Sequence, residues 1–340
     1  MDADRWLYAL SLSAVASSVA GLLVPLYLVR IGGGAAQLGV NAALSSLVGA
    51  PAAVLAGRYA DRTGNRRGVV LAALAVAALA LVTLPLLETI SGVIVVNAVL
   101  AASLAAIGPV VTMLVVGDAP EDLWSTRIAR LNTLQGYGNT TGLVLGTVWM
   151  VGLGAVLAVG VTQQTLFVLA AVFGVAAAVL AFQSLPRHAE LDLGPRPSNR
   201  VATLLSQTSR NVRFDVFHFG TTRIFWATRA LSPARLVELP RTLPSALWVY
   251  FLAAFLFFTG FAVFWAPLPV YLTGRASLGP GAIFGLYLVN NVASTLLFDD
   301  AGAIARQHDV RLIQGSALGV RSVAFAGVGL LGILGLGALA

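Results

Sequence analysis

Residues 57–67, GRYADRTGNRR, place one carboxylate among four guanidinium groups between two apolar runs. Asp61 can accept charge-assisted hydrogen bonds from arginine or from the N-terminus of a neighbouring helix. Gly57 lets another helix approach closely, and Gly64 permits the tight turn that a short loop needs. Such groups suit a contact that holds helices together at a membrane surface. The arginines alone would also serve to orient the chain in a membrane.

A second set of polar groups lies inside apolar runs. Gln135 and Asn139 are four residues apart, so they share one face of a helix with Asn132. The same run predicts close helix packing as the other reason for this face, because glycine recurs every four residues at positions 138, 142 and 146. Asn97 is an isolated amide that needs a partner from the protein or from a ligand.

Three further residues are candidates for ligand contact, with packing as the alternative for each: Trp265, Tyr287 and Asn290. Asn291 follows Asn290 about 100° around the helix, so at most one of the two faces a cavity squarely.

The composition predicts that a lipid bilayer surrounds these elements. Of the 340 residues, 58% are hydrophobic and 10% are charged, whereas roughly 25% are charged in an average soluble domain. Several stretches of about 20 residues carry no charge, and about 20 residues cross a hydrocarbon core of roughly 30 Å. We therefore expect an all-α membrane protein.

Other classes of function find little support. The net charge of +7 comes without a basic groove interleaved with aromatic residues, so nucleic-acid binding is not expected. The chain has no Cys, and its three His residues, His188, His218 and His308, fall far apart in predicted loops. No metal site, cofactor or membrane-embedded enzyme is predicted, because neither a metal-ligand cluster nor an intramembrane carboxylate pair is present.

Nine apolar segments of spanning length are expected. Six form an N-terminal half at residues 1–185, a polar cytoplasmic linker follows at residues 186–244, and three more form a C-terminal half at residues 245–340. The expected spans are Trp6–Val29, Ala35–Ala56, Gly68–Leu87, Gly92–Val116, Leu131–Val151, Thr165–Leu185, Ser245–Leu272, Gly281–Phe298 and Gly319–Leu339.

Arginine placement predicts the orientation of the chain. Arginines concentrate in the loops after spans two, four, six and eight, and basic loops stay in the cytoplasm. We therefore expect a multi-pass protein of the cell membrane with a cytoplasmic N-terminus. A short internal repeat at a constant offset of 244 predicts two parallel halves: Pro25, Tyr27 and Leu28 match Pro269, Tyr271 and Leu272.

Residues 57–67 resemble the signature G-x-x-x-D-R-x-G-x-R-R of the major facilitator superfamily at every specified position, in the loop where that family has it. The resemblance implies a secondary transporter with six helices in each half and alternating access to a central site. It also implies that the loop meets an acidic residue at the end of span four, a place that Asp118 occupies. The second copy of the signature keeps Gly302 but has Arg306 in place of the aspartate. The gate residues that the resemblance implies are Gly57, Asp61, Arg62, Gly64, Arg66, Arg67 and Asp118.

The resemblance places the substrate midway through the membrane between the halves, where the candidates are Asn97, Gln135, Asn139, Trp265, Tyr287 and Asn290. No Asp, Glu, Lys or His falls in the middle of an expected span, so we expect no mid-membrane charge that could neutralise an ionic substrate. A small neutral or amphipathic solute is the predicted substrate.

Length favours a second interpretation as well. Residues 245–340 have room for three spans where the family plan has six, so the C-terminal half is expected to be incomplete after the ninth helix. The alternative function is therefore a membrane protein without transport activity. It would be either a truncated product or a subunit that needs a partner chain to supply the missing helices.

Overall fold

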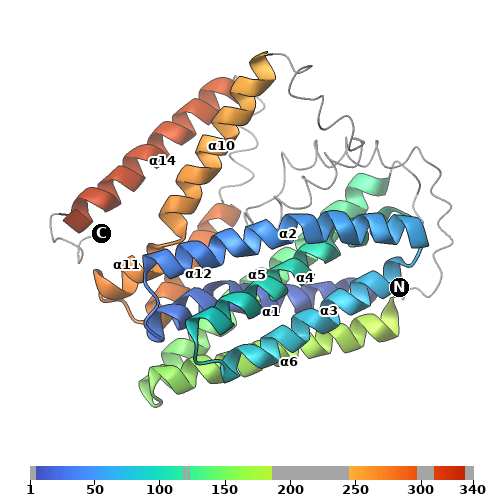
Figure 1. Cartoon of the computed structure of the whole chain (residues 1–340), viewed down its shortest axis with the longest axis horizontal. Coiled ribbons are helices and arrows are strands. Elements are labelled where there is room, and N and C mark those ends of the chain that lie inside the picture. Colours follow the sequence, from blue (N-terminus) through green and yellow to red (C-terminus); the bar gives the residue numbers. More distant parts are fainter. Residues whose placement is uncertain (1–4, 118–119, 121–122, 186–244, 297–309, 334–340) are drawn as a thin grey trace.

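The computed structural model describes residues 5–117, 120, 123–185, 245–296 and 310–333, and within these residues it is built of helices without strands (Figure 1). This architecture confirms the prediction of an all-α membrane protein. The first part of the chain forms α1 (Arg5–Arg30), α2 (Ala35–Thr63), α3 (Arg66–Thr83), η1 (Leu84–Leu86), α4 (Ile90–Gly117), α5 (Trp124–Gly152), η3 (Leu153–Ala155) and α6 (Val159–Ser184). The later part forms α10 (Ser245–Trp265), α11 (Leu268–Gly274), α12 (Pro280–Leu296) and α14 (Val310–Ile333).

Six helical segments among the described residues are long and apolar enough to cross a membrane: Arg5–Arg30, Ala35–Thr63, Arg66–Leu86, Ile90–Gly117, Val159–Ser184 and Phe255–Gly274. Helix α12 has only 17 residues, and α5 carries the amides and two arginines that the sequence places in its first half. The predicted linker at residues 186–244 lies outside the described residues.

The seventh predicted span is two helices rather than one. Helix α10 ends at Trp265, and α11 begins at Leu268. Pro267 lies between them and has no N–H to donate to the preceding turn, so a continuous helical ladder is broken there. The carbonyl of Pro267 instead accepts the N–H of Val270 at 3.0 Å, in the first turn of α11.

The last expected span, Gly319–Leu339, overlaps α14, whose described residues run from Val310 to Ile333. The apolar part of this helix is Gly315–Leu330. A helix continues for as long as its backbone N–H and C=O groups pair, so it can extend beyond its apolar run. Arg321 lies within the apolar part.

Helix α1 is the central helix of the N-terminal bundle, with α5 and α6 packed against it. Tyr27 of α1 is completely buried, donates its hydroxyl to the carbonyl of Leu87 at 2.7 Å, and meets the ring of Phe167 edge-on at 5.3 Å. Helix α4 packs against both α2 and α3. The bundle therefore has a continuous apolar core around α1.

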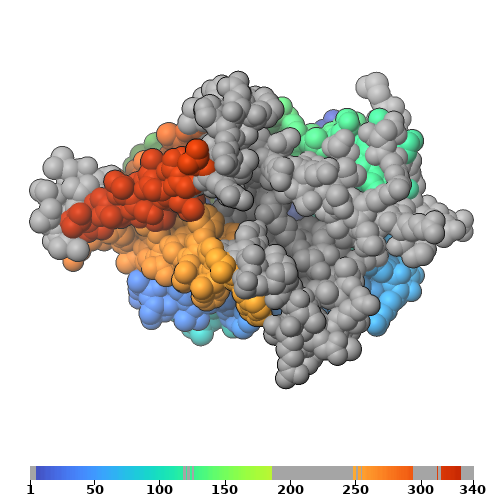
Figure 2. Space-filling view, turned by 90° about the horizontal axis from the view of Figure 1, so that it is seen from above, coloured from blue at the N-terminus to red at the C-terminus, as the bar shows by residue number. Residues whose placement is uncertain are grey.

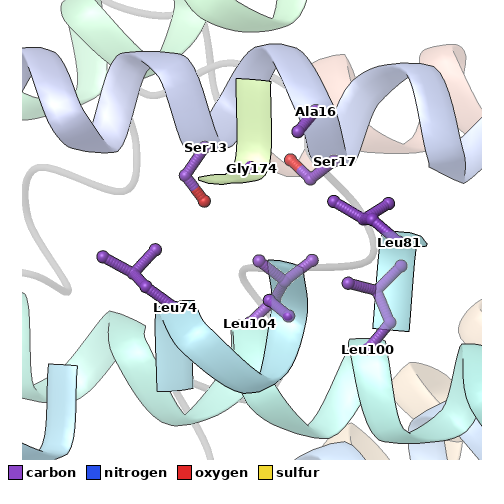
Figure 3. Close-up of a pocket in the computed structure, with 9 residues that line it drawn as sticks. Ser13, Ala16, Ser17, Leu74, Leu81, Leu100, Leu104 and Gly174 are labelled. Carbon is purple, nitrogen blue, oxygen red and sulfur yellow. The ribbon is translucent and has the colours of Figure 1, made fainter. Parts of the chain in front are cut away.

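A small void lies inside this bundle. Figure 3 shows it between α1, α3, α4 and α6, where the side chains of Leu74, Leu81, Leu100 and Leu104 lie opposite Ser13 and Ser17 of α1. The void measures about 10 Å³, close to the smallest volume that holds one water molecule. This void is therefore too small for a solute.

The two parts of the chain meet mainly where α12 packs on α5, with a smaller contact between α11 and α1. Helices α10 and α14 lie beside each other and diverge from the N-terminal bundle (Figure 1). We call the contact between α5 and α12 the junction.

Candidate functional site

The charged motif of residues 57–67 forms the turn between α2 and α3. Gly64 adopts the left-handed conformation, with φ of 69°, and its N–H donates to the carbonyl of Ala60 at 2.9 Å. A residue with a side chain is strained in this conformation, so glycine ends α2 at little cost. Asn65 then starts α3, because its Oδ1 accepts the N–H of Gly68 at 2.9 Å.

Arg67 ties this turn to the end of another helix. Its guanidinium donates to the carbonyl of Phe182 at 2.6 Å and lies 5.7 Å from the centre of the Phe182 ring. Phe182 belongs to the last turn of α6, where backbone carbonyls lack intrahelical partners and the helix dipole favours a cation. Sequence reasoning missed Phe182, because no local pattern links it to a motif 115 residues earlier.

The remaining motif residues lie at the same end of the bundle. Arg66 is buried with 9% of its surface exposed, and Asp61 and Arg62 are exposed. Asp61 and Arg66 each interact with another group. Gly57 is buried in the last part of α2. Asp118, which the family resemblance pairs with this loop, lies outside the described residues.

Gly138, Gly142 and Gly146 of α5 are packing positions. A Cβ at Gly142 would lie 2.6 Å from the carbonyl oxygen of Val15 in α1. Two interhelical hydrogen bonds fasten the same contact, from Ser11 Oγ to the carbonyl of Leu134 and from Ser18 Oγ to the carbonyl of Asn139, both at 2.9 Å. Gly138 also faces α1, whereas Gly146 faces the ring of Phe284 in α12.

Gln135 and Asn139 lie beside these two contact faces. At about 100° per residue from Gly138, Gln135 at about 60° lies between Gly142 at about 40° and Gly146 at about 80°, whereas Asn139 at about 100° lies on the side that touches α12. Both side chains are half-buried. The structure thus brings them to the edge of the junction, where three helices from both parts of the chain approach one another.

The two neighbouring asparagines of α12, Asn290 and Asn291, face different sides of the helix, as the rotation of about 100° per residue requires. Asn291 faces α5 and accepts the hydroxyl hydrogen bond of Thr140 at 3.1 Å, whereas Asn290 is exposed. The sequence favoured Asn290, but the structure brings its neighbour into the junction.

Asn97 has protein partners within the N-terminal bundle. Its Nδ2 donates to Asn41 Oδ1 at 2.9 Å and lies 3.2 Å from Ser45 Oγ. All three side chains belong to the packing of α4 on α2. Of the two partners expected for this amide, protein or ligand, the structure shows a protein partner, which accounts for an amide in an apolar run.

Trp265 and Tyr287 form an aromatic contact between α10 and α12, with ring centres 5.6 Å apart and planes at 71°. Within the described residues, the Nε1 of Trp265 is buried without a hydrogen-bond partner, and so is the hydroxyl of Tyr271 in α11. A buried donor without a partner is costly, so these groups are suited to a ligand.

Arg321 lies within the apolar part of α14, Gly315–Leu330. It is half-buried, and its guanidinium lies over the rings of Phe257 and Phe261 of α10. The search for charges inside the expected spans considered Asp, Glu, Lys and His and did not single out this arginine.

A cavity of about 340 Å³ opens at the end of the junction where α5, η3 and α6 meet the start of α12. Met150, Val151, Thr162, Gly279, Pro280 and Gly281 line it. Its volume is within the usual range for small-molecule sites, roughly 300–1,000 Å³. Among the described residues, no group of three or more His, Cys, Asp or Glu could hold a metal ion.

Comparison with known proteins gives one family. The family model described as Major Facilitator Superfamily matches residues 6–340, on both sides of the linker. No curated protein matches the sequence.

Proposed function

The chain belongs to the major facilitator superfamily and is therefore a secondary membrane transporter, and we propose that it works by alternating access between two halves, residues 1–185 and 245–340. The halves would rock about the junction, so that a central site opens to one side of the membrane at a time.

The observation that carries this proposal is the composition of the junction. Along α5 it consists of the Thr140–Asn291 hydrogen bond, the contact of Gly146 with Phe284 and the approach of Gly281 to Val151. Most of these positions have small side chains. Among the described residues, the Thr140–Asn291 bond is the one hydrogen bond between α5 and α12. Such a seam can separate with little loss of buried polar interaction.

We propose a small neutral or amphipathic solute as the substrate, held at the edge of the junction. Gln135 and Asn139 would supply amide hydrogen bonds, and Trp265 and Tyr287 would supply aromatic surface and a free indole donor. Asn97 contributes to helix packing instead, and the exposure of Asn290 makes Asn291 the better candidate in α12.

We further propose that the protein lies in the cell membrane with its N-terminus and the α2–α3 turn in the cytoplasm, because its short basic loops gather at that end. In this orientation the turn forms the cytoplasmic gate. The anchoring of Arg67 to α6 supports this role, because it fixes the turn to the N-terminal half.

Labelling of a single cysteine tests alternating access without knowledge of the substrate, because the native chain has no Cys. The variant Asn139→Cys is treated with a membrane-impermeant maleimide in right-side-out and in inside-out vesicles. We expect labelling from both faces, because the central site opens to each in turn. A static membrane subunit would be labelled from one face at most.

A disulfide across the junction distinguishes alternating access from a permanent pore. The substitutions Val151→Cys and Gly281→Cys are combined with Asn139→Cys, and the first two cysteines are oxidised to a disulfide before labelling. This disulfide, the junction lock, joins two close positions, because a Cβ on residue 281 would lie 2.8 Å from Val151 Cγ2. The lock should stop labelling of Cys at 139 from the face where α5 ends and leave labelling from the opposite face intact.

The matched control is a disulfide inside the N-terminal half, Ala78→Cys with Gly174→Cys. The Cβ atoms of that pair would be 3.8 Å apart, the usual spacing in a disulfide. Since α3 and α6 move together in the proposal, this lock should leave labelling from both faces unchanged. Labelling that ignores the Val151–Gly281 lock would refute alternating access about this junction.

A further inference from the structure

Arg321 of α14 is a half-buried cation without a polar partner among the described residues. Its guanidinium carbon lies 5.8 Å from the ring centre of Phe257 and 5.6 Å from that of Phe261, both in α10. No hydrogen bond or ion pair of Arg321 accompanies these ring contacts within the described part of the chain. Two rings at this distance attract a cation weakly and leave its five N–H donors available.

Arg321 lies inside the apolar part of α14, Gly315–Leu330. Its guanidinium lies against the rings of α10 rather than beside a carboxylate of the described residues. A guanidinium in apolar surroundings with unused N–H donors is suited to an anionic partner.

An aromatic stripe leads away from this cation. Phe257, Phe261 and Trp265 are four residues apart on one face of α10, with successive ring centres 6.3 Å and 5.6 Å apart. The stripe ends at Tyr287 of α12, 5.6 Å from Trp265. The stacked rings of Phe264 and Phe325, 3.8 Å apart, hold α14 against α10 beside it, and Figure 2 shows the two helices lying alongside each other.

The stripe faces the protein rather than the lipid. Phe257, Phe261 and Trp265 are half-buried, whereas Phe255 and Phe258 of the same helix expose 66% and 56% of their surface. Trp265 Nε1, a polar group on the stripe, is buried and lacks a partner among the described residues. It lies about one helical turn beyond Phe261, roughly 5 Å along α10.

We propose that Arg321 and the aromatic stripe form the binding site for a small amphipathic organic anion. The anionic group pairs with the guanidinium of Arg321, the flat apolar body lies along Phe261 toward Trp265, and an acceptor atom of the solute receives the indole N–H. The inference rests on the proposed transport function and narrows it, because it selects the amphipathic solute over the neutral one.

A pair of fluorescent probes with the same ring system tests this site. The probe 1-anilinonaphthalene-8-sulfonate carries a charge, and N-phenyl-1-naphthylamine is its neutral counterpart. Binding of each is titrated on the purified chain in nanodiscs of phosphatidylcholine. Arg321→Gln should weaken binding of the sulfonate at least tenfold, which corresponds to about 1.4 kcal/mol, and leave binding of the neutral probe unchanged.

Two variants make the result specific. Arg321→Lys keeps the charge and should bind the sulfonate more tightly than Arg321→Gln does. Arg30→Gln is the matched control, because Arg30 also lies over an aromatic ring, 4.5 Å from the centre of Tyr27, but at the end of α1. It should bind the sulfonate as the native chain does. Each variant is compared only where it elutes as a single species in size-exclusion chromatography.

The same assay separates a solute from a lipid headgroup, which offers similar chemistry. Nanodiscs with phosphatidylglycerol should bind the sulfonate as those of phosphatidylcholine do. If phosphatidylglycerol displaces the probe only when Arg321 is present, the site belongs to lipid and the proposal fails. It also fails if Arg321→Gln and the native chain bind the sulfonate equally, or if Arg30→Gln loses as much.

Failure here is distinguishable from failure of the transport proposal. The titration measures binding to the purified protein, whereas maleimide labelling of Cys at position 139 measures movement in vesicles. Unchanged probe affinity in Arg321→Gln, together with labelling from both faces, would remove only the anion site.

Discussion

The substitution Gly142→Ala in α5 should destabilise the N-terminal half by separating two helices. The added Cβ would lie 2.6 Å from the carbonyl oxygen of Val15 and 3.0 Å from Ser18 Cβ in α1. A carbonyl oxygen belongs to the backbone and cannot rotate away. Helices α1 and α5 must therefore move apart by several tenths of an ångström, which also stretches the bond from Ser18 Oγ to Asn139 O.

The size of the effect follows from two opposing terms. Overpacking a tight contact costs about 1–3 kcal/mol, whereas replacing a helical glycine by alanine gains about 0.8–1 kcal/mol of helix propensity. Gly136→Ala is the matched control, because it makes the same change in the same helix and its Cβ would meet nothing within 4 Å. The difference in free energy of unfolding between the two variants should isolate the overpacking term, about 1–3 kcal/mol.

Thermal unfolding in detergent, followed by tryptophan fluorescence, measures this difference. Gly136→Ala should melt at or slightly above the native temperature, and Gly142→Ala several degrees below Gly136→Ala. Equal melting temperatures for the two alanine variants would show that α1 and α5 are not in close contact at Gly142.

Two other predictions concern the orientation of the chain and its gate. With the N-terminus in the cytoplasm, Thr63→Cys at the α2–α3 turn should be labelled only from the cytoplasmic face. Val156, which follows η3, is 82% exposed, and Val156→Cys should be labelled only from outside. The reverse pattern would show that the N-terminus lies outside. Asp61→Asn should speed labelling of Cys at position 139 from the cytoplasmic face by about two- to fivefold, because an exposed ionic contact is worth at most about 1 kcal/mol. Glu88→Gln, which changes an exposed carboxylate at the opposite end of α3, should have no effect, and equal rates in Asp61→Asn and the native chain would exclude Asp61 from the gate.

The features predictable from the sequence were those with a local cause. The lipid environment of each apolar run follows from its length and lack of charge. Each of the first six expected spans overlaps one of α1 to α6, and all of these helices except α5 are long and apolar enough to cross a membrane. Gly64 lies within a short polar loop, and its left-handed conformation follows from the turn that such a loop requires. The glycines at every fourth position of α5 predicted close packing, and the structure supplies α1 and α12 as the packed helices.

The features that the sequence did not predict depend on distant partners. The partner of Arg67 is a backbone carbonyl, which leaves no mark in the residue type at position 182. Asn97 needed a partner in either interpretation, and only the fold shows that Asn41 and Ser45 supply it. The choice between Asn290 and Asn291 likewise depends on the rotation of α12 against α5, which the hydrogen bond from Thr140 reveals.

Arg321 decides between a neutral and an anionic substrate in the proposed binding site. It lies near the start of the expected last span, where a charge reads as an interfacial anchor. In the structure it lies inside the apolar part of α14, Gly315–Leu330, against the rings of α10. Its contacts with Phe257 and Phe261 cover the rings of α10 but satisfy none of its donors. The argument for a neutral substrate rested on the absence of such a group, so its presence in α14 favours the amphipathic anion.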